Sequence, residues 1–228
     1  MSGVRPWRVE DRDDVADFFD GIAASYGETH GGDELLAYRV GVLRDLLGEH
    51  GPELLEVGCG AGLHLHALGG TVGVDLSAGM LERTRALCPD ARLVQAPAET
   101  LAGVADASVD AVVVVGVLEH VLDKAAALAS VHRVLRPGGV LALMTPDGRH
   151  PWYRLADRVG YGVRHLESDR FLGRDELVRL VEQAGLRVER TRSWRFVPAG
   201  DMPRWAALAM RLSERVGWPG GLAVRATR

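Results

Sequence analysis

A glycine-rich turn with an acidic residue on either side is the stretch of this chain best suited to bind a nucleoside. The turn covers residues 58–62, GCGAG, and follows a strand-like run that contains Glu56; a second acid, Asp75, ends the next strand-like run. Glycines let the backbone approach a ligand, and a carboxylate at a strand end can accept hydrogen bonds from both ribose hydroxyls. A dinucleotide turn needs its third glycine where this chain has Leu63. The spacing therefore favours a nucleoside without a pyrophosphate.

The elements that must hold this turn alternate between strand-like and helix-like patterns. Strands are predicted at 53–57, 71–75, 91–95, 110–115, 140–145, 186–191 and 222–227, and helices at 15–26, 33–47, 62–68, 77–87, 123–135 and 174–184. This order predicts an α/β fold, a Rossmann-like seven-stranded, mostly parallel sheet with helices on both faces. Ligands of such sheets lie beyond the carboxyl ends of the strands. Residues that follow the strands should therefore meet at one crevice.

The alternation also divides the chain into regions, and we expect one domain over residues 1–228. Residues 1–50 would place helices over the site, and residues 51–145 would bind the cofactor. Segments 146–173 and 194–221 break the alternation and are rich in aromatic residues, so we expect them to form a substrate cap. Those aromatic residues are Trp152, Tyr153, Tyr161, Phe171, Trp194, Trp205 and Trp218.

Composition excludes several classes of partner. The net charge is −4, which provides no electrostatic drive toward nucleic acid. The N-terminal segment is charged where a signal peptide would be apolar, and no apolar run is long enough for a membrane span. Two cysteines cannot build a disulfide framework. We therefore expect a cytoplasmic protein, as a monomer or a homodimer.

Four ordered motifs resemble one family. They are EVGCGAG at 56–62, VGVDLS at 72–77, VLEHV at 117–121 and LRPGG at 135–139. Together they resemble the class I S-adenosylmethionine-dependent methyltransferases, and most closely the small-molecule branch that includes ubiquinone-type, menaquinone-type and many natural-product enzymes. The resemblance implies S-adenosylmethionine as cofactor, S-adenosylhomocysteine as product and no metal.

The resemblance also implies a set of cofactor contacts. Tyr26 and Glu56 would lie at the methionine end and Asp75 at the ribose, although Glu56 could equally brace the turn and Asp75 could cap the next helix. Many relatives carry Asp or Asn where this chain has Pro97, which leaves the Ala98 amide and Glu99 for the adenine edge. The implied contacts are Tyr26, Glu56, Gly58, Cys59, Gly60, Asp75, Leu76, Met80, Ala98, Glu99, Gly116 and Val117.

Methyl transfer from a sulfonium depends mainly on alignment, with a base where the acceptor must lose a proton. Histidine is the natural base near neutrality, and the candidates are His120 and His165. The candidate substrate contacts are Tyr26, His150, Trp152, Tyr153 and His165. No metal site is expected, because His64 and His66 diverge on a helix.

The sequence thus predicts methyl transfer to O, N or C of a small, partly aromatic or apolar metabolite. The alternative is an S-adenosylmethionine-binding protein of the same fold that catalyses a non-methylation step or acts as a binding module. An NAD-dependent oxidoreductase is disfavoured by Leu63. A protein or RNA methyltransferase is disfavoured by the acidic balance.

Overall fold

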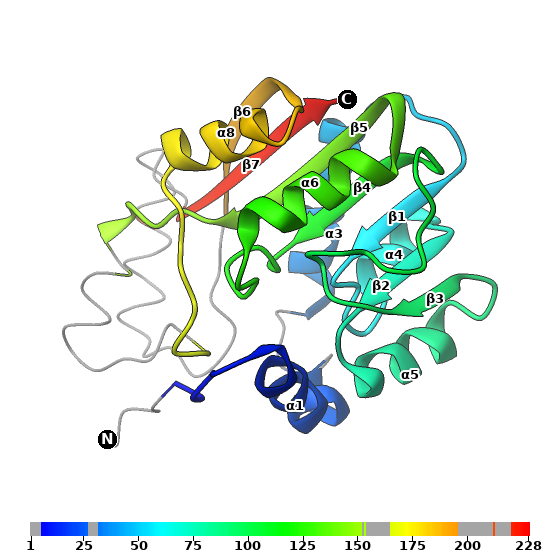
Figure 1. The fold of residues 1–228 in the computed structure, drawn as a ribbon, viewed down its shortest axis with the longest axis vertical. Helices are drawn as coiled ribbons and strands as arrows, with labels where there is room; N and C mark the ends of the chain where they lie inside the picture. The colour runs from blue at the N-terminus through cyan, green and yellow to red at the C-terminus, as the bar shows by residue number, and fades with distance from the viewer. Residues whose placement is uncertain (1–5, 27–31, 152, 154–164, 196–211, 213–219) are drawn as a thin grey trace.

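The computed structural model describes residues 6–26, 32–151, 153, 165–195, 212 and 220–228. These residues form one sheet with helices on both faces (Figure 1). The strands are β1 (Leu54–Val57), β2 (Val72–Asp75), β3 (Arg92–Gln95), β4 (Val109–Val115), β5 (Leu135–Pro146), β6 (Arg187–Arg195) and β7 (Gly220–Thr227). The helices are α1 (Arg12–Ile22), the short 3₁₀ helix η1 (Ala23–Ser25), α3 (Gly32–Leu47), α4 (Leu63–Leu68), α5 (Ala78–Leu87), α6 (Lys124–Val134) and α8 (Arg174–Gln183).

The sheet confirms the predicted fold class. Its seven strands follow the order β3-β2-β1-β4-β5-β7-β6. Strands β1 to β5 pair in parallel, and β7 runs antiparallel between β5 and β6. The carboxyl ends of β1, β2 and β4 therefore lie at the same edge of the sheet. That edge is where the glycine turn and the VLEHV segment begin.

The central strand β4 is buried on both faces because its side chains alternate between two cores. Val112 belongs to the apolar cluster beneath α6 and α8, and Val113 belongs to the cluster beneath α3. Figure 1 shows α6 and α8 in front of the sheet and α3 behind it. This two-sided core holds the strand ends, and with them the site, in one place.

Two predicted helix caps are confirmed. The Ser77 hydroxyl accepts a hydrogen bond from the Met80 amide at 3.0 Å, and the Asp123 carboxylate accepts one from the Ala126 amide at 2.9 Å. Most predicted boundaries hold to within a residue or two; the exceptions are α1, which begins three residues before the predicted 15–26, β6, which ends four residues after the predicted 186–191, and the region of LRPGG. We expected that motif to separate helix from strand, but β5 already begins at Leu135, which pairs with Val109 before a register shift.

The predicted placement of Trp194 in a substrate cap is wrong. Strand β6 continues past residue 191, and Trp194 is 2% exposed within the core. Its indole N–H donates to the carbonyls of Leu222 at 3.0 Å and Thr145 at 3.3 Å. Gly221 pairs with Trp194 and leaves room for the ring, since a Cβ at Gly221 would come within 2.5 Å of it. Strand pairing with β7 therefore buries a residue that composition alone had assigned to the cap.

The remainder of the predicted caps is described only in part. Residues 152, 154–164, 196–211 and 213–219, which include Trp152, Tyr161, Trp205 and Trp218, lie outside the described residues. Within the described residues, no helix has the length and apolarity to cross a lipid bilayer.

Candidate active site

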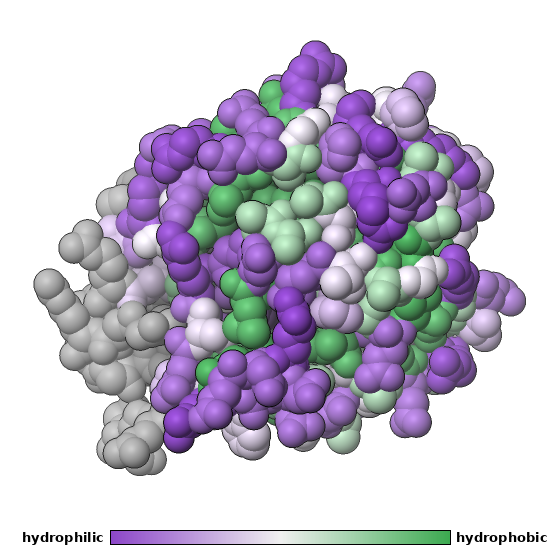
Figure 2. Space-filling model, viewed as in Figure 1, coloured by the Kyte–Doolittle hydropathy of each residue, from purple (hydrophilic) through white to green (hydrophobic). Residues whose placement is uncertain are grey.

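A cavity of about 730 Å³ lies beyond the carboxyl ends of β1, β2 and β4, between the strand ends and α1. This volume includes space that is open to solvent. Figure 2 shows apolar surface between α1, at the bottom of the view, and the loops above it. The lining residues are Arg12, Val15, Phe19, Tyr26, Val57, Gly58, Gly60, Val74, Asp75, Leu76, Met80, Ala96, Pro97, Ala98, Glu99, Val115, Gly116, Val117, His120, Val121 and Leu122.

The glycine turn and Asp75 form one end of this cavity. Gly58 has φ +66°, and a Cβ there would come within 2.3 Å of the Val117 side chain. The Asp75 carboxylate accepts hydrogen bonds from the amides of Gly60 at 2.7 Å and Ser77 at 2.9 Å. Burial raises the pKa of Asp75, and these amides oppose the rise. Asp75 thus braces the turn and also presents carboxylate surface to the cavity.

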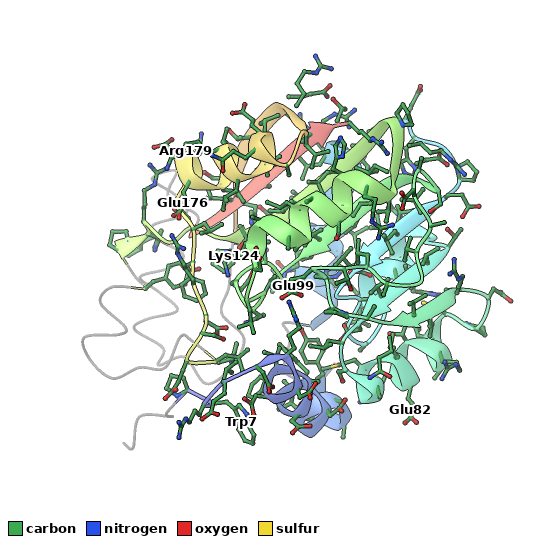
Figure 3. The ribbon with its side chains drawn as sticks, viewed as in Figure 1. Trp7, Glu82, Glu99, Lys124, Glu176 and Arg179 are labelled. Atoms are coloured by element: carbon green, nitrogen blue, oxygen red, sulfur yellow. The ribbon has the colours of Figure 1, made fainter. Side chains whose placement is uncertain are left out.

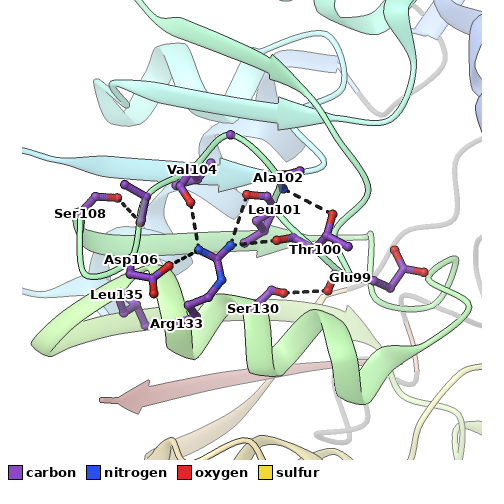
Figure 4. Close-up of polar contacts among 12 residues, drawn as sticks. Glu99, Thr100, Leu101, Ala102, Val104, Asp106, Ser108, Ser130, Arg133 and Leu135 are labelled. Carbon is purple, nitrogen blue, oxygen red and sulfur yellow. Dashed lines mark hydrogen bonds and ion pairs between the residues drawn. The ribbon is translucent and has the colours of Figure 1, made fainter.

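The loop that follows β3 forms the floor beside Asp75, and helix α6 holds it in place (Figure 4). The Arg133 guanidinium donates to the carbonyls of Thr100 at 2.8 Å, Leu101 at 3.3 Å and Val104 at 3.0 Å. The Ser130 hydroxyl donates to the Glu99 carbonyl at 2.7 Å. Leu101 has φ +43°, an uncommon conformation for a non-glycine residue. These contacts fix the backbone of residues 97–99 along the cavity.

Arg12 closes the cavity above this loop. Its Nε lies 3.1 Å from the Glu99 carboxylate, and both residues line the cavity. The Arg12 side chain is 47% exposed, whereas that of Glu99 is 6% exposed. The first residue of α1 therefore reaches across the cavity to the loop after β3.

The opposite end of the cavity contains His120 paired with Asp169. The imidazole Nδ1 lies 2.6 Å from one Asp169 oxygen, and the other oxygen accepts hydrogen bonds from the amides of His165 at 2.8 Å and Leu166 at 3.0 Å. Burial lowers the pKa of His120, but the hydrogen bond and charge of Asp169 outweigh it, so the pKa is raised overall. The pKa of Asp169 is lowered, because its hydrogen bonds and the His120 charge outweigh burial. The pair is therefore an imidazole with a 12% exposed side chain, whose orientation is set by a fully buried carboxylate.

Helix α1 forms an aromatic wall beside His120. The rings of Phe19 and His120 meet edge to face, with centroids 5.4 Å apart. Outside them, Phe18 packs between Phe19 and Trp7. The Asp20 carboxylate anchors the helix, since it accepts hydrogen bonds from the Gly79 amide at 2.9 Å and from the Ser77 hydroxyl.

The comparisons with known proteins agree with this geometry. Residues 55–143 match the family described as Methyltransferase domain. The ubiquinone biosynthesis O-methyltransferase of Thiobacillus denitrificans is 32% identical over 174 residues, which are 69% of this chain and 74% of that protein. The chain belongs to the class I S-adenosylmethionine-dependent methyltransferases.

Solved structures share the fold at lower identity. A methyltransferase of Thermotoga maritima, a possible histamine N-methyltransferase, is 21% identical with a TM-score of 0.70, covering 92% of this chain and 98% of that one. The [4+2]-cyclase SpnF is 17% identical with a TM-score of 0.70, covering 98% and 99%. The matches cover 36%, 54% and 60% of the length of the first curated relatives.

Most residues predicted to contact the cofactor line the cavity of this methyltransferase. They are Tyr26, Gly58, Gly60, Asp75, Leu76, Met80, Ala98, Glu99, Gly116 and Val117. Glu56 and Cys59 do not line it. Glu56 is 1% exposed and contacts His64 Nδ1 at 3.3 Å, while Cys59 is 4% exposed with its sulfur 3.8 Å from the Thr84 hydroxyl. Glu56 and Cys59 therefore support the glycine turn on the side that faces away from the cavity.

The candidate bases and substrate contacts are spread more widely. His120 lines the cavity, whereas His165 is exposed, with its ring centroid 6.1 Å from that of His120. His150 and Tyr153 are each 4% exposed and lie outside the cavity lining. The Tyr153 hydroxyl donates to the Gly220 carbonyl at 3.1 Å, which indicates a structural role. Trp152 lies outside the described residues.

Sequence reasoning missed three residues of this region: Arg12, Asp169 and Arg39. Arg39 has its guanidinium 5.6 Å from the Trp194 ring, and its buried Nε has no hydrogen-bond partner in the described part of the chain. Burial lowers the pKa of Arg39, and the nearby Tyr26 opposes this. Burial, together with Asp75, raises the pKa of Tyr26 to about 12. The sequence signal that could have identified Arg39 is a charged residue within the apolar pattern of the helix predicted at 33–47.

The described residues contain no cluster of three or more His, Cys, Asp or Glu side chains arranged to hold a metal ion.

Proposed function

We propose that the chain transfers a methyl group from S-adenosylmethionine to a hydroxyl oxygen of a small, partly aromatic or apolar metabolite. The observation that carries this proposal is the His120–Asp169 pair at the end of the cavity opposite the glycine turn. A hydroxyl must lose its proton during methylation, whereas a neutral amine need not. An oriented imidazole at the cavity can take that proton.

The residues at the other end fit S-adenosylmethionine. The backbone of Gly58 and Gly60 leaves a space that β-carbons would restrict, and Asp75 offers a carboxylate for ribose hydroxyls. Leu76, Met80 and the Ala98 backbone supply apolar and amide surface for an adenine ring. Arg39 and Tyr26 would hold the cofactor's carboxylate, because the buried Nε of Arg39 has no hydrogen-bond partner within the described residues and Tyr26, whose charge interacts with Arg39, lines the cavity. When bound, the cofactor supplies an electrophilic methyl group.

In this proposal His120 acts as the general base. If the Nδ1–H group donates a hydrogen bond to Asp169, the imidazole is neutral and its Nε2 is free of a proton, so that Nε2 can accept one. Nε2 would take the hydroxyl proton, and Asp169 would stabilise the imidazolium that forms. The walls beside it are apolar, from Val15, Phe19 and Val121, and suit an aromatic or apolar acceptor. The name of the Thiobacillus denitrificans relative, an O-methyltransferase, supports oxygen as the accepting atom.

The predicted caps enter this proposal as well. Of the two predicted cap segments, 146–173 and 194–221, the described residues 165–173 of the first would supply part of the acceptor wall. Asp169 belongs to the first of these segments and already contacts the site.

A mass-spectrometric screen tests the function. The protein is incubated with S-adenosylmethionine and a panel of phenols, catechols, aliphatic alcohols and aromatic amines, and products are analysed for the addition of one methyl. We expect transfer to hydroxyl acceptors, lost in the His120→Gln variant. Transfer to amines alone would contradict the assignment of oxygen. Tight binding of the cofactor with no transfer to any acceptor would favour the alternative, a non-methylating protein of the same fold.

A further inference from the structure

Lys124 is the chain's only lysine, and its side chain is buried at the start of α6 (Figure 3). The residue is 9% exposed. Its ammonium donates to the carbonyl of Val121 at 2.8 Å and to that of Glu119 at 3.3 Å. No carboxylate among the described residues forms an ion pair with it, and burial lowers the pKa of Lys124. A buried ammonium is thus held chiefly by backbone oxygens.

The first turn of α6 is an electrostatically unfavourable place for the Lys124 ammonium. Asp123 caps α6, which places Lys124 in the first turn of the helix. The N-terminal end of a helix carries partial positive charge, which disfavours a cation there. Burial disfavours the charge further. The two carbonyls, and the nearby charges of Glu119 and Asp169, offset these unfavourable contributions.

The two carbonyls flank His120 in the sequence. That of Glu119 belongs to the peptide bond that leads into His120, and that of Val121 lies one residue beyond. Three other hydrogen bonds hold this turn: the His120 amide donates to the Val117 carbonyl at 2.9 Å, the Arg170 amide donates to the Glu119 carbonyl at 3.1 Å, and the Thr145 hydroxyl donates to the Glu119 carboxylate at 3.1 Å. Within this set, only Lys124 binds the Val121 carbonyl. The direction of a side chain depends on the backbone dihedral angles of its residue. A cation that holds both carbonyls therefore also restricts the orientation of the His120 imidazole.

We propose that Lys124 is a positioning residue for methyl transfer, holding the carbonyls on either side of His120 so that the imidazole stays between Asp169 and the cavity. This inference rests on the proposed role of His120 as the base. Lys124 itself does not line the cavity. Its effect is exerted through the backbone of the turn.

The test measures how firmly the imidazole is held. In protein labelled with ¹⁵N-histidine and bound to S-adenosylhomocysteine, NMR reports the solvent exchange of the His120 Nδ1 proton, assigned with His120→Gln. Lys124→Met keeps the aliphatic stem and removes the charge, and we expect exchange to become about tenfold faster, the effect of losing a charge-assisted hydrogen bond. Lys124→Arg keeps a cation and should restore most of the protection. Exchange at the wild-type rate in Lys124→Met would overturn the proposal.

Arg228→Met is the matched control. Arg228 donates to the carbonyls of Arg133, at 3.2 Å, and Leu135, so it too is a cation bound to two carbonyls, but at the far end of α6. We expect its loss to leave the Nδ1 exchange unchanged. Equal acceleration in both variants would indicate a general loosening of α6 and would overturn the specific role of Lys124.

A wild-type measurement covers the case in which Lys124→Met does not fold. A single lysine gives a single side-chain Nζ signal, and we expect a slowly exchanging ammonium at neutral pH. A freely exchanging amine would overturn the proposal. None of these readouts requires turnover, so a wild-type protein that fails to methylate refutes the proposed function while leaving the Lys124 result interpretable.

Discussion

The two ends of the cavity are built in different ways. The cofactor end comes from short local segments, each of which directly follows a strand: the glycine turn after β1, Asp75 at the end of β2, and residues 96–99 after β3. The acceptor end comes from residues far apart in the sequence. His120 meets Asp169 across 49 positions, and Phe19 reaches it from α1.

This difference separates what the order of the strands places from what depends on packing between distant segments. The local segments depend only on the strand order, which the whole fold enforces. The acceptor end depends on how α1 and the loop of residues 165–170 pack against the strand ends; the backbone contacts between Trp7 and residues 165–167 join these two segments. The account therefore predicts that changes at one end leave the function of the other end intact.

The largest expected effect comes from His120→Gln at the acceptor end. Loss of a general base lowers kcat by about 10²- to 10⁴-fold, while the affinity for S-adenosylhomocysteine should stay within about twofold, since the cofactor end is untouched. Steady-state kinetics with an acceptor from the screen and calorimetry measure the two quantities. His132→Gln, late in α6 and outside the cavity, is the control. A parallel loss of cofactor affinity in His120→Gln would break the comparison.

The next largest effect is expected for Asp75→Ala at the cofactor end. The loss of charge-assisted hydrogen bonds to ribose, together with the released amides of Gly60 and Ser77, should weaken S-adenosylhomocysteine binding by about 10- to 100-fold. Calorimetry gives the affinity directly. Asp45→Ala removes a carboxylate that is also paired, with Arg190 and Arg192, but on the surface, and it should change nothing.

The pH dependence sharpens the assignment of the acceptor end. His120 accepts a proton only when neutral, so kcat should rise with pH through a pKa above the ordinary histidine value of 6.5. In Asp169→Asn the carboxylate no longer raises the pKa and burial lowers it, so the rise should move to lower pH while the maximal rate falls. An unmoved profile would show that Asp169 does not act on the base.

The same pair makes a pH-dependent contribution to stability. Because the folded pKa of His120 is raised, its contribution is fully present below the unfolded value and is lost as pH rises through the folded pKa. Activity and this part of the stability therefore change in opposite directions over the same pH window. Urea unfolding of the wild type and Asp169→Asn on both sides of that window measures it.

The smallest expected effect concerns Arg12, which joins α1 to the cofactor end. The pair with Glu99 is half exposed on the arginine side, and such pairs contribute at most about 1 kcal/mol. Arg12→Met should therefore weaken S-adenosylhomocysteine binding by no more than about fivefold, with kcat unchanged. A loss as large as that of Asp75→Ala would show that α1 belongs to the cofactor end more than to the acceptor end.

The sequence predicted the fold, and it predicted most of the residues that line the cavity beside the glycine turn, because their signals are local. Strand periodicity, the glycine spacing and the caps Ser77 and Asp123 are each contained within a few residues, so they can be recognised without tertiary information. The positions that surround the cavity follow from the rule that ligands lie at the carboxyl ends of parallel strands.

At the proposed acceptor end, His120 was predicted as a candidate base, but its partner Asp169 could not be predicted, because the two residues meet only in three dimensions. Asp169 is one acid among several polar residues in its loop, and nothing nearby marks it as the partner of His120. Trp194 looked like a cap residue by composition, and only its pairing with Gly221 shows that it belongs to the core. Lys124 looked like an ordinary residue at the start of a helix.

The central claim is that the cofactor end binds its ligand independently of His120. Calorimetric titration of three proteins with S-adenosylhomocysteine tests this most directly. The account predicts that the wild type and His120→Gln bind with similar affinity and that Asp75→Ala binds at least about tenfold more weakly. Failure of the wild type to bind, or equal affinity in all three, would contradict it.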